Sequence, residues 1–214
     1  MDYDKAYHET ATYFGGGPDP LLESWAPHLD PRQPVLDVGC GQGRNTVYLA
    51  RRGFTVDAVD PSRVAIAQLR RQVSREALAV RAFCAGFSDA QLGRARYGGI
   101  LVFGLLQELE WPDIGSLTAY CGQLLAADGL LLLTAFSTLD PIFPYHQRTW
   151  HSIGHNSYRS PEGGIRTYLE PAQILELFDG YEVLHHWEGL GPEHRHGDGP
   201  PERHGRVEAV LRNS

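Results

Sequence analysis

The feature that most constrains the fold is an apolar segment that runs into a group of glycines. Residues 34–38 are apolar except for Asp37, and Gly39, Gly41 and Gly43 then precede a segment of helical character from Asn45. Glycine permits positive φ angles and lets the backbone approach a ligand closely. The first turn of the following helix offers free N–H groups to a carboxylate or a phosphate. This order predicts a strand, a turn and a helix with a cofactor site at the turn.

The glycine spacing separates two classes of cofactor. A nicotinamide or flavin dinucleotide site requires its third glycine three residues after the second, and that position holds Arg44. Asp37 lies two residues before the first glycine, where it would repel a diphosphate and attract an ammonium group. The turn therefore favours a cofactor with an amino-acid tail. A dinucleotide-dependent oxidoreductase is the alternative, and the absence of an obvious hydride-transfer partner also disfavours it.

Apolar runs alternate along the chain with segments of helical periodicity, which is typical of βαβ units. We predict an α/β fold with a doubly wound, mostly parallel, seven-stranded Rossmann-like sheet and an antiparallel edge, because the last two strands are joined by a loop. Asp128-Gly129 is expected to end the helix before the fifth strand. The expected strands are 34–38, 55–59, 79–84, 99–103, 130–136, 181–187 and 206–211, and the expected helices are 45–52, 62–73, 114–126 and 171–178.

The same pattern predicts one domain over residues 1–214. Residues 1–33 are expected to form a helical cover, with an amphipathic helix at 21–28. The 137–167 segment breaks the alternation and is expected to be a long irregular insertion on the substrate side, because such loops often carry function. The Gly- and His-rich 189–205 segment is expected to be a further loop.

The composition limits which binding partners and which cellular compartment we expect for the chain. The net charge is −7 and Lys5 is the only lysine, which argues against binding to nucleic acid. The three cysteines are widely spaced and odd in number, which predicts a reducing, cytoplasmic location without disulfides. We expect no membrane-spanning segment. A metal site on His196 and His204 is disfavoured because the loop has no cysteine and no tight ligand spacing, so we predict no metal.

Asp60 is the second candidate for cofactor binding. It ends the second expected strand, about 20 residues after the glycine turn, where a carboxylate accepts hydrogen bonds from both ribose hydroxyls. The alternative is that Asp60 caps the following helix, a role that Ser62 could fill equally well.

These residues resemble the recurrent motifs of class I S-adenosylmethionine-dependent methyltransferases. The resemblance comprises residues 37–43, Asp60 and Asp128-Gly129-Leu130, and it extends over nearly the whole chain. Within that class, residues 41–50 and the Glu193-His194-Arg195 loop are similar to the tellurite-resistance methyltransferases. The resemblance implies S-adenosyl-L-methionine as the cofactor and methyl transfer to a small-molecule acceptor as the reaction.

The resemblance also implies roles for individual residues. The glycines would line the methionine part, Asp37 would orient its amino group and Asp60 would hold the ribose. Gly86-Phe87 replaces the usual acidic residue near adenine, so adenine is expected on backbone groups and on the Phe87 ring. Gly98 replaces a usual aspartate, which raises a non-catalytic cofactor-binding protein as a second alternative. The expected cofactor-binding residues are Asp37, Gly39, Cys40, Gly41, Gly43, Asn45, Asp60, Pro61, Ser62, Gly86, Phe87 and Phe103.

Methyl transfer from a sulfonium needs no acid for the leaving group, so positioning supplies most of the rate. His194 and Arg195 are the candidate catalytic residues, because they match the His-Arg pair of the resembled family and would give an electropositive pocket for a soft anion. The alternative is a solvated surface loop. The aromatic residues Tyr3, Tyr7, Tyr13 and Phe14 could cover the sulfonium by a cation–π contact or pack in the core. The expected substrate-binding residues are Tyr13, Gln107, His146, Tyr158 and Arg159.

Overall fold

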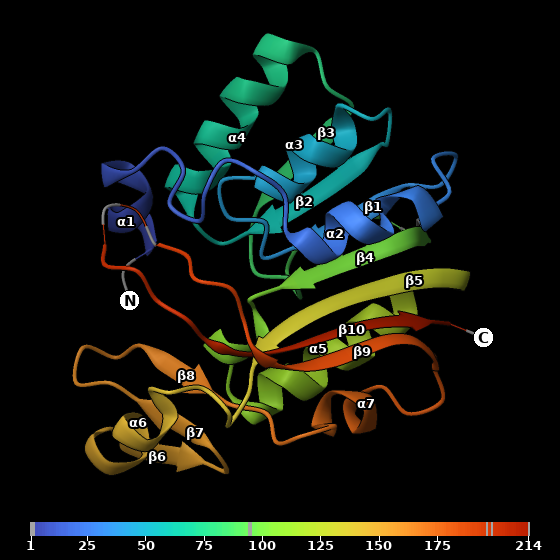
Figure 1. Cartoon of the computed structure of the whole chain (residues 1–214). Coiled ribbons are helices and arrows are strands. Elements are labelled where there is room, and N and C mark those ends of the chain that lie inside the picture. Colours follow the sequence, from blue (N-terminus) through green and yellow to red (C-terminus); the bar gives the residue numbers. More distant parts are fainter. Residues whose placement is uncertain (1–2, 94–95, 196, 198, 214) are drawn as a thin grey trace.

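A seven-stranded sheet with the order β3-β2-β1-β4-β5-β10-β9 organises the molecule, seen in a computed structural model that describes residues 3–93, 96–195, 197 and 199–213 (Figure 1). Strands β1 to β5 run parallel to one another, and β10 lies antiparallel between β5 and β9. The predicted fold class is therefore confirmed, with the antiparallel strand one place in from the edge. The strands are β1 (Val35–Val38), β2 (Val56–Asp60), β3 (Val80–Cys84), β4 (Tyr97–Phe103), β5 (Leu125–Phe136), β9 (Glu182–Leu190) and β10 (Gly205–Arg212).

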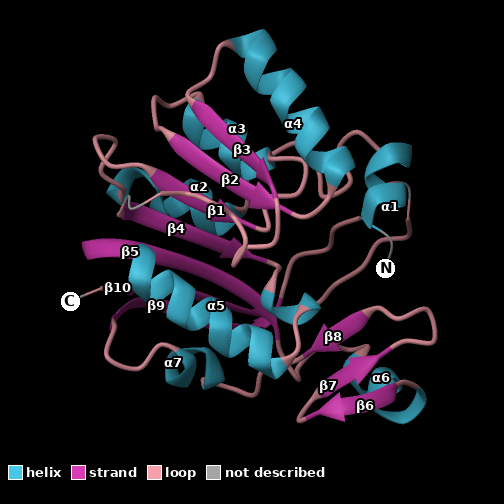
Figure 2. Ribbon diagram, turned by 180° about the vertical axis from the view of Figure 1, so that it is seen from behind, coloured by secondary structure: helices cyan, strands magenta, loops and turns pink. Residues whose placement is uncertain are grey.

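Helices cover both faces of this sheet, as a central strand that is apolar throughout requires. Successive side chains of a strand point to opposite faces. In β4, Ile100 packs into the cluster under α5 and α7, while the adjacent Leu101 packs into the cluster under α2 and α3. Figure 2 shows α5 and α7 on the near side of the sheet. The helices are α2 (Pro20–Trp25), α3 (Arg44–Ala50), α4 (Arg63–Glu76), α5 (Trp111–Leu124) and α7 (Gln173–Leu177).

The 137–167 segment is ordered, which corrects the expectation of an irregular insertion. It forms α6 (Phe143–Thr149) and an antiparallel sheet of β6 (His151–Gly154), β7 (Ser157–Arg159) and β8 (Ile165–Thr167). Strands of three or four residues are too short to show an alternating pattern in the sequence. Hydrogen bonds order them instead, including that from Thr167 Oγ1 to the Leu109 carbonyl at 2.6 Å.

Asp128-Gly129 does not end a helix, contrary to the prediction. Helix α5 ends at Leu124, and β5 begins at Leu125. Asp128 has a φ of 60°, so the pair bends the chain within β5 rather than before it. The Asp128 N–H donates to the Asn213 carbonyl at 2.7 Å, which fixes this bend to the end of the chain that follows β10.

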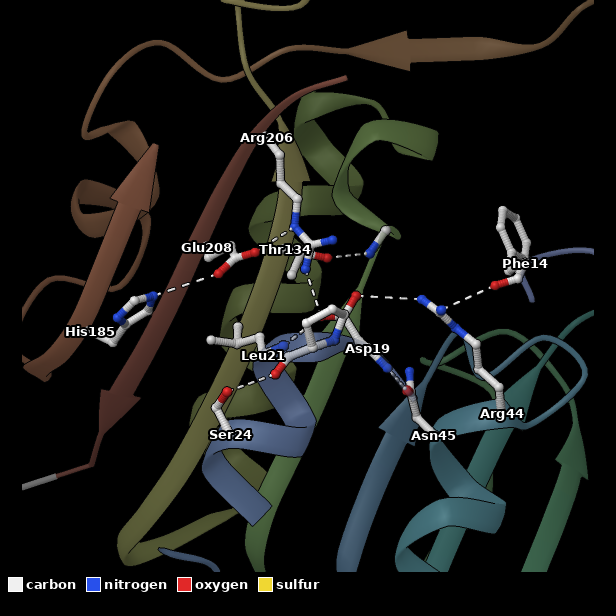
Figure 3. Close-up of polar contacts among 12 residues, drawn as sticks. Phe14, Asp19, Leu21, Ser24, Arg44, Asn45, Thr134, His185, Arg206 and Glu208 are labelled. Carbon is white, nitrogen blue, oxygen red and sulfur yellow. Dashed lines mark hydrogen bonds and ion pairs between the residues drawn. The ribbon is translucent and has the colours of Figure 1, made fainter. Parts of the chain in front are cut away.

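The N-terminal cover consists of α1 (Tyr3–Glu9), α2 and a 3₁₀ turn, η1 (Ala26–His28). Asp19 attaches it to the rest of the molecule (Figure 3). The buried Asp19 carboxylate accepts from Leu21 N at 3.0 Å, which caps α2, and pairs with Arg44 at 3.4 Å and with Arg206 at 2.6 Å. Its own N–H donates to Asn45 Oδ1 at 2.8 Å. One carboxylate thus joins the cover to α3 and β10.

No helix within the described ranges is long and apolar enough to span a membrane.

Candidate active site

A cavity of about 1080 Å³ lies at the carboxyl ends of β1, β2, β4 and β5. This is the edge where open α/β sheets bind ligands, beside the reversal of strand order between β1 and β4. The volume exceeds the range of about 300–1,000 Å³ typical of a site for one drug-sized ligand. The cavity therefore has room for a nucleoside cofactor and a small second molecule. Its walls come from the N-terminal cover, the glycine turn, the segment after β4, β8 and the 191–206 segment.

The glycine turn is built as the sequence predicts. Gly39, Gly41 and Gly43 have φ angles of 72°, 52° and 84°, all in the left-handed region that favours glycine. Gly39 and Gly41 line the cavity. Gly43 does not, and a side chain there would collide with Leu69 of α4. Two of the glycines therefore keep backbone open to a ligand, and the third allows close helix packing.

Asp60 lies beside this turn at the end of β2. Its Oδ2 accepts from Gly41 N at 2.8 Å and its Oδ1 from Ser62 N at 2.8 Å. Burial raises the pKa of its carboxyl. Ser62 caps α4, because its Oγ accepts from Ala65 N at 3.0 Å. Ser62 therefore performs the helix-capping role that was the alternative for Asp60. A carboxylate oxygen can accept more than one hydrogen bond, so Asp60, which lines the cavity, can still bind a ligand hydroxyl.

Asp37 is buried beneath the turn, outside the cavity lining. Thr46 Oγ1 donates to its Oδ2 at 2.6 Å. Burial raises the pKa of Asp37 to about 6. Any effect of Asp37 on a ligand therefore passes through the turn or through Thr46.

The N-terminal aromatic residues cover the turn. The Tyr7 ring lies 5.7 Å from the Tyr3 ring and 6.1 Å from the Tyr13 ring, and the Tyr13 and Phe14 rings are 4.9 Å apart. The Tyr7 hydroxyl would lie 3.0 Å from a Cβ placed on Gly41. This packing closes the cavity over the glycine turn, and the cation–π contact remains a prediction.

The other end of the cavity is polar. Gln107 and Glu108 belong to η2 (Leu106–Glu108), a 3₁₀ turn just after β4. Arg166 of β8 donates to Glu108 Oε2 at 2.7 Å, and the Tyr3 hydroxyl also bonds Glu108. Burial, followed by the Glu108 charge, raises the pKa of Tyr3. Gln107 is 7% exposed, and its Oε1 has no hydrogen-bond partner among the described residues.

His194 and Arg195 lie at the rim of the cavity, and both are exposed. His194 Nδ1 is 3.1 Å from the Pro192 carbonyl oxygen, and Arg195 donates to the Gly199 carbonyl at 2.9 Å. Their position agrees with the predicted loop, and their catalytic role remains a prediction. His196 lies outside the described residues.

His204 faces the same cavity from just before β10. Its Nδ1 is 2.9 Å from Asp140 Oδ2, and its ring stacks on Phe136 at 4.3 Å. In the part of the chain that the structure describes, no group of three or more His, Cys, Asp or Glu residues could hold a metal ion.

The structure brings most of the predicted cofactor residues to the cavity. Those that line it are Gly39, Cys40, Gly41, Asn45, Asp60, Pro61, Ser62 and Phe103, together with the acceptor-side candidates Tyr13, Gln107, His194 and Arg195. Asp37, Gly43, Gly86 and Phe87 are not part of the lining. The Phe87 ring lies 5.7 Å from the Tyr120 ring and packs against the core under α5.

Three predicted substrate residues of the insertion also lie outside the lining. His146 Nδ1 is 2.7 Å from the Tyr168 hydroxyl, and burial lowers the pKa of His146. Tyr158 is buried, and Arg159 pairs with Glu110 at 2.5 Å. These side chains hold the small sheet together and fix it to the segment before α5.

Sequence reasoning did not assign roles to Asp19, Arg44, Glu108 or Arg206, which form ion pairs in the cavity wall. Arg44 and Glu108 are next in sequence to predicted site residues, and this adjacency could have indicated that they belong to the site. The pair of Asp19 with Arg206 joins residues 187 positions apart, and no local pattern predicts it.

The fold and the cavity are those of an α/β protein with a ligand site at the carboxyl ends of its parallel strands. We call the end beside Gly39, Gly41 and Asp60 the cofactor end, and the end beside Gln107 and Glu108 the acceptor end. Residues 35–129 match the family described as methyltransferase domain. An uncharacterized methyltransferase of Bacillus subtilis, YodH, is 34% identical over 128 residues, which cover 60% of this chain and 53% of the relative. The chain spans about half the length of the curated relatives it matches.

Two solved structures share the fold. TehB from Haemophilus influenzae superposes with a TM-score of 0.74 and 19% identity, covering 98% of this chain and 67% of that one. The 1,6-didemethyltoxoflavin-N1-methyltransferase of Burkholderia thailandensis, with its substrate and S-adenosylhomocysteine bound, gives a TM-score of 0.69 and 19% identity and covers 100% and 86% of the two chains. Residues 35–129 therefore match a methyltransferase domain, and over nearly its whole length the chain has the fold of these two solved structures. The likeness to TehB, at 19% identity, is one of fold.

Proposed function

We propose that this chain transfers the methyl group of S-adenosylmethionine to a small-molecule acceptor. The observation that carries the proposal is one cavity with a glycine turn and a carboxylate at one end and, at the other, the Gln107 amide, whose Oε1 has no hydrogen-bond partner among the described residues. A structural neighbour, the N1-methyltransferase of Burkholderia thailandensis, binds both 1,6-didemethyltoxoflavin and S-adenosylhomocysteine, which supports this division.

The residues fit the cofactor. Gly39 and Gly41 leave bare backbone against which the methionine part would lie, and Asp60 would accept the ribose hydroxyls. Asp37 would act on the amino group indirectly, through the turn. Asn45, at the start of α3, would complete this end together with the helix N–H groups.

S-adenosylmethionine supplies an electrophilic methyl group on a positively charged sulfur. With that group bound, the cavity residues would hold the acceptor atom in line with it, so that the acceptor lone pair could form the new bond to carbon while the carbon–sulfur electron pair stays on sulfur. An acceptor that carries an N–H or O–H group releases its proton to water at the rim, where His194 and Arg195 lie.

We further propose that the 214 residues act as one methyltransferase domain in the cytoplasm. Cys40, Cys84 and Cys121 are all free thiols in the structure, which supports a reducing compartment.

Calorimetric titration and a product assay test the proposal together. We expect S-adenosylhomocysteine to bind, NADH and NADPH not to bind, and S-adenosylhomocysteine to be released with at least one member of a panel of amines, phenols, thiols, carboxylates and oxyanions. Tight NADH binding without a response to S-adenosylhomocysteine would replace the proposal with an oxidoreductase. Cofactor binding without turnover on any acceptor would favour a non-catalytic binding protein.

A further inference from the structure

Gln107 lines the acceptor end of the cavity with a buried amide side chain. Gln107 is more than nine-tenths buried, and its Oε1 lacks a hydrogen-bond partner among the described residues. Buried polar atoms are almost always paired, and an unpaired one is unfavourable. The arrangement calls for a ligand that donates a hydrogen bond.

The partly buried arginines that line the cavity are already paired with carboxylates, whereas Arg52 and Arg195, which are exposed, donate to backbone carbonyls. Arg166 pairs with Glu108, and both side chains are less than one-fifth exposed. Arg44 and Arg206 share the buried Asp19 carboxylate, and Arg206 also lies 2.9 Å from Glu208 (Figure 3). An anionic ligand would have to separate one of these pairs and leave a carboxylate uncompensated in a partly buried site. The partly buried wall of the cavity therefore offers little free positive charge to an oxyanion.

We propose that the methyl acceptor is an uncharged molecule that presents an N–H or O–H group to Gln107 Oε1, next to the Arg166–Glu108 pair. This inference rests on the proposed function and names the substrate class of the same site. Gln107 binds and orients the acceptor. Its amide takes no proton, so the proton released on methylation goes to water. The proposal departs from the soft-anion chemistry that the resemblance to tellurite-resistance proteins implies.

The first test needs no substrate. In Gln107→Met a thioether of similar length replaces the amide, and we expect the urea midpoint of the ligand-free protein to stay the same or rise, because an unpaired carbonyl leaves the interior. Thr46→Val is the matched control at a buried polar side chain that is paired, with Asp37 at 2.6 Å, and it should lower the midpoint. If Gln107→Met lowers the midpoint as much as Thr46→Val, the amide has a structural partner and the proposal is overturned.

The second test measures S-adenosylhomocysteine release. Neutral phenols, anilines and heterocyclic N–H compounds are compared with tellurite, selenite and arsenite. We expect turnover of neutral donors and little of the oxyanions. Gln107→Met should lower kcat/KM for the best acceptor about 10- to 100-fold, while the Kd for S-adenosylhomocysteine changes less than about twofold. Gln123→Met, on the exposed face of α5, is the matched control and should leave both values unchanged.

The outcomes separate the two proposals. An oxyanion as the best acceptor, or unchanged kcat/KM in Gln107→Met, would overturn the inference and leave methyl transfer intact. Cofactor binding with no turnover on the whole panel would count against methyl transfer itself, and the urea comparison would then decide whether the Gln107 amide is a ligand group.

Discussion

The two ends of the cavity are built in different ways. The cofactor end comes from one continuous stretch of 22 residues that contains Gly39, Gly41 and Asp60, in which the Gly41 N–H donates to the Asp60 carboxylate. The acceptor end collects Tyr3, Gln107, Glu108 and Arg166 from α1, η2 and β8. We expect the cofactor, which many enzymes share, to bind to a locally formed turn. The acceptor, which differs between enzymes, is expected to bind to side chains from distant segments. The two ends should therefore respond separately to substitution.

The largest effect is expected at Gly43, where the turn meets α4. Gly43→Ala places a side chain at a φ of 84° and against Leu69, and it should lower the free energy of unfolding by about 2–4 kcal/mol. Gly53→Ala is the matched control, because Gly53 has a φ of 90° but nothing within 4 Å of the added carbon. It should cost about 1 kcal/mol. Equal losses in urea denaturation would show that close packing at Gly43 contributes nothing.

The next effect concerns cofactor affinity. Asp60→Asn removes the charge that both holds Gly41 and would accept the ribose hydroxyls, and it should weaken S-adenosylhomocysteine binding about 10- to 100-fold in calorimetry. Asp179→Asn, at an exposed position, serves as the control. An unchanged Kd in Asp60→Asn would remove Asp60 from the site.

The sequence predicted the cofactor end because its determinants are local. A positive-φ glycine turn after an apolar strand and a carboxylate at the next strand end follow from residue type and spacing alone. Glu108 and Asp19 were not assigned because their partners depend on how β8 and β10 pack against η2 and the N-terminal cover. The insertion was misjudged for a related reason, since its short strands are held by hydrogen bonds such as that from Thr167 and not by an apolar pattern.

A smaller effect should come from the ion pair at the acceptor end. Arg166→Met leaves the Glu108 carboxylate unpaired and should lower the free energy of unfolding by about 1–2 kcal/mol, with no change in S-adenosylhomocysteine affinity. Adding Glu108→Gln should restore most of the loss, because the uncompensated charge is then gone. A large drop in cofactor affinity in Arg166→Met would show that the two ends are coupled.

The smallest expected effect is a pH dependence of stability that arises from Asp37, which is buried beneath the glycine turn. The pKa of Asp37 is raised from 3.8 to about 6 in the folded protein, so the folded state binds this proton more tightly than the unfolded state. Stability from this group is therefore present below about pH 4 and is lost as the pH rises through about 6. Asp37→Asn should reduce by about 1 kcal/mol the difference between the free energies of unfolding measured in urea at pH 5 and pH 8. An identical difference in both proteins would contradict the burial of an ionisable Asp37.

A structure of the protein with S-adenosylhomocysteine bound tests the central claim most directly. The account predicts the ribose hydroxyls at about 2.6–3.2 Å from the Asp60 carboxylate. It also places the amino-acid tail against Gly39 and Gly41, with the sulfur facing Gln107. A ligand bound elsewhere, or a glycine turn still covered by Tyr7 with no cofactor beside it, would contradict the account.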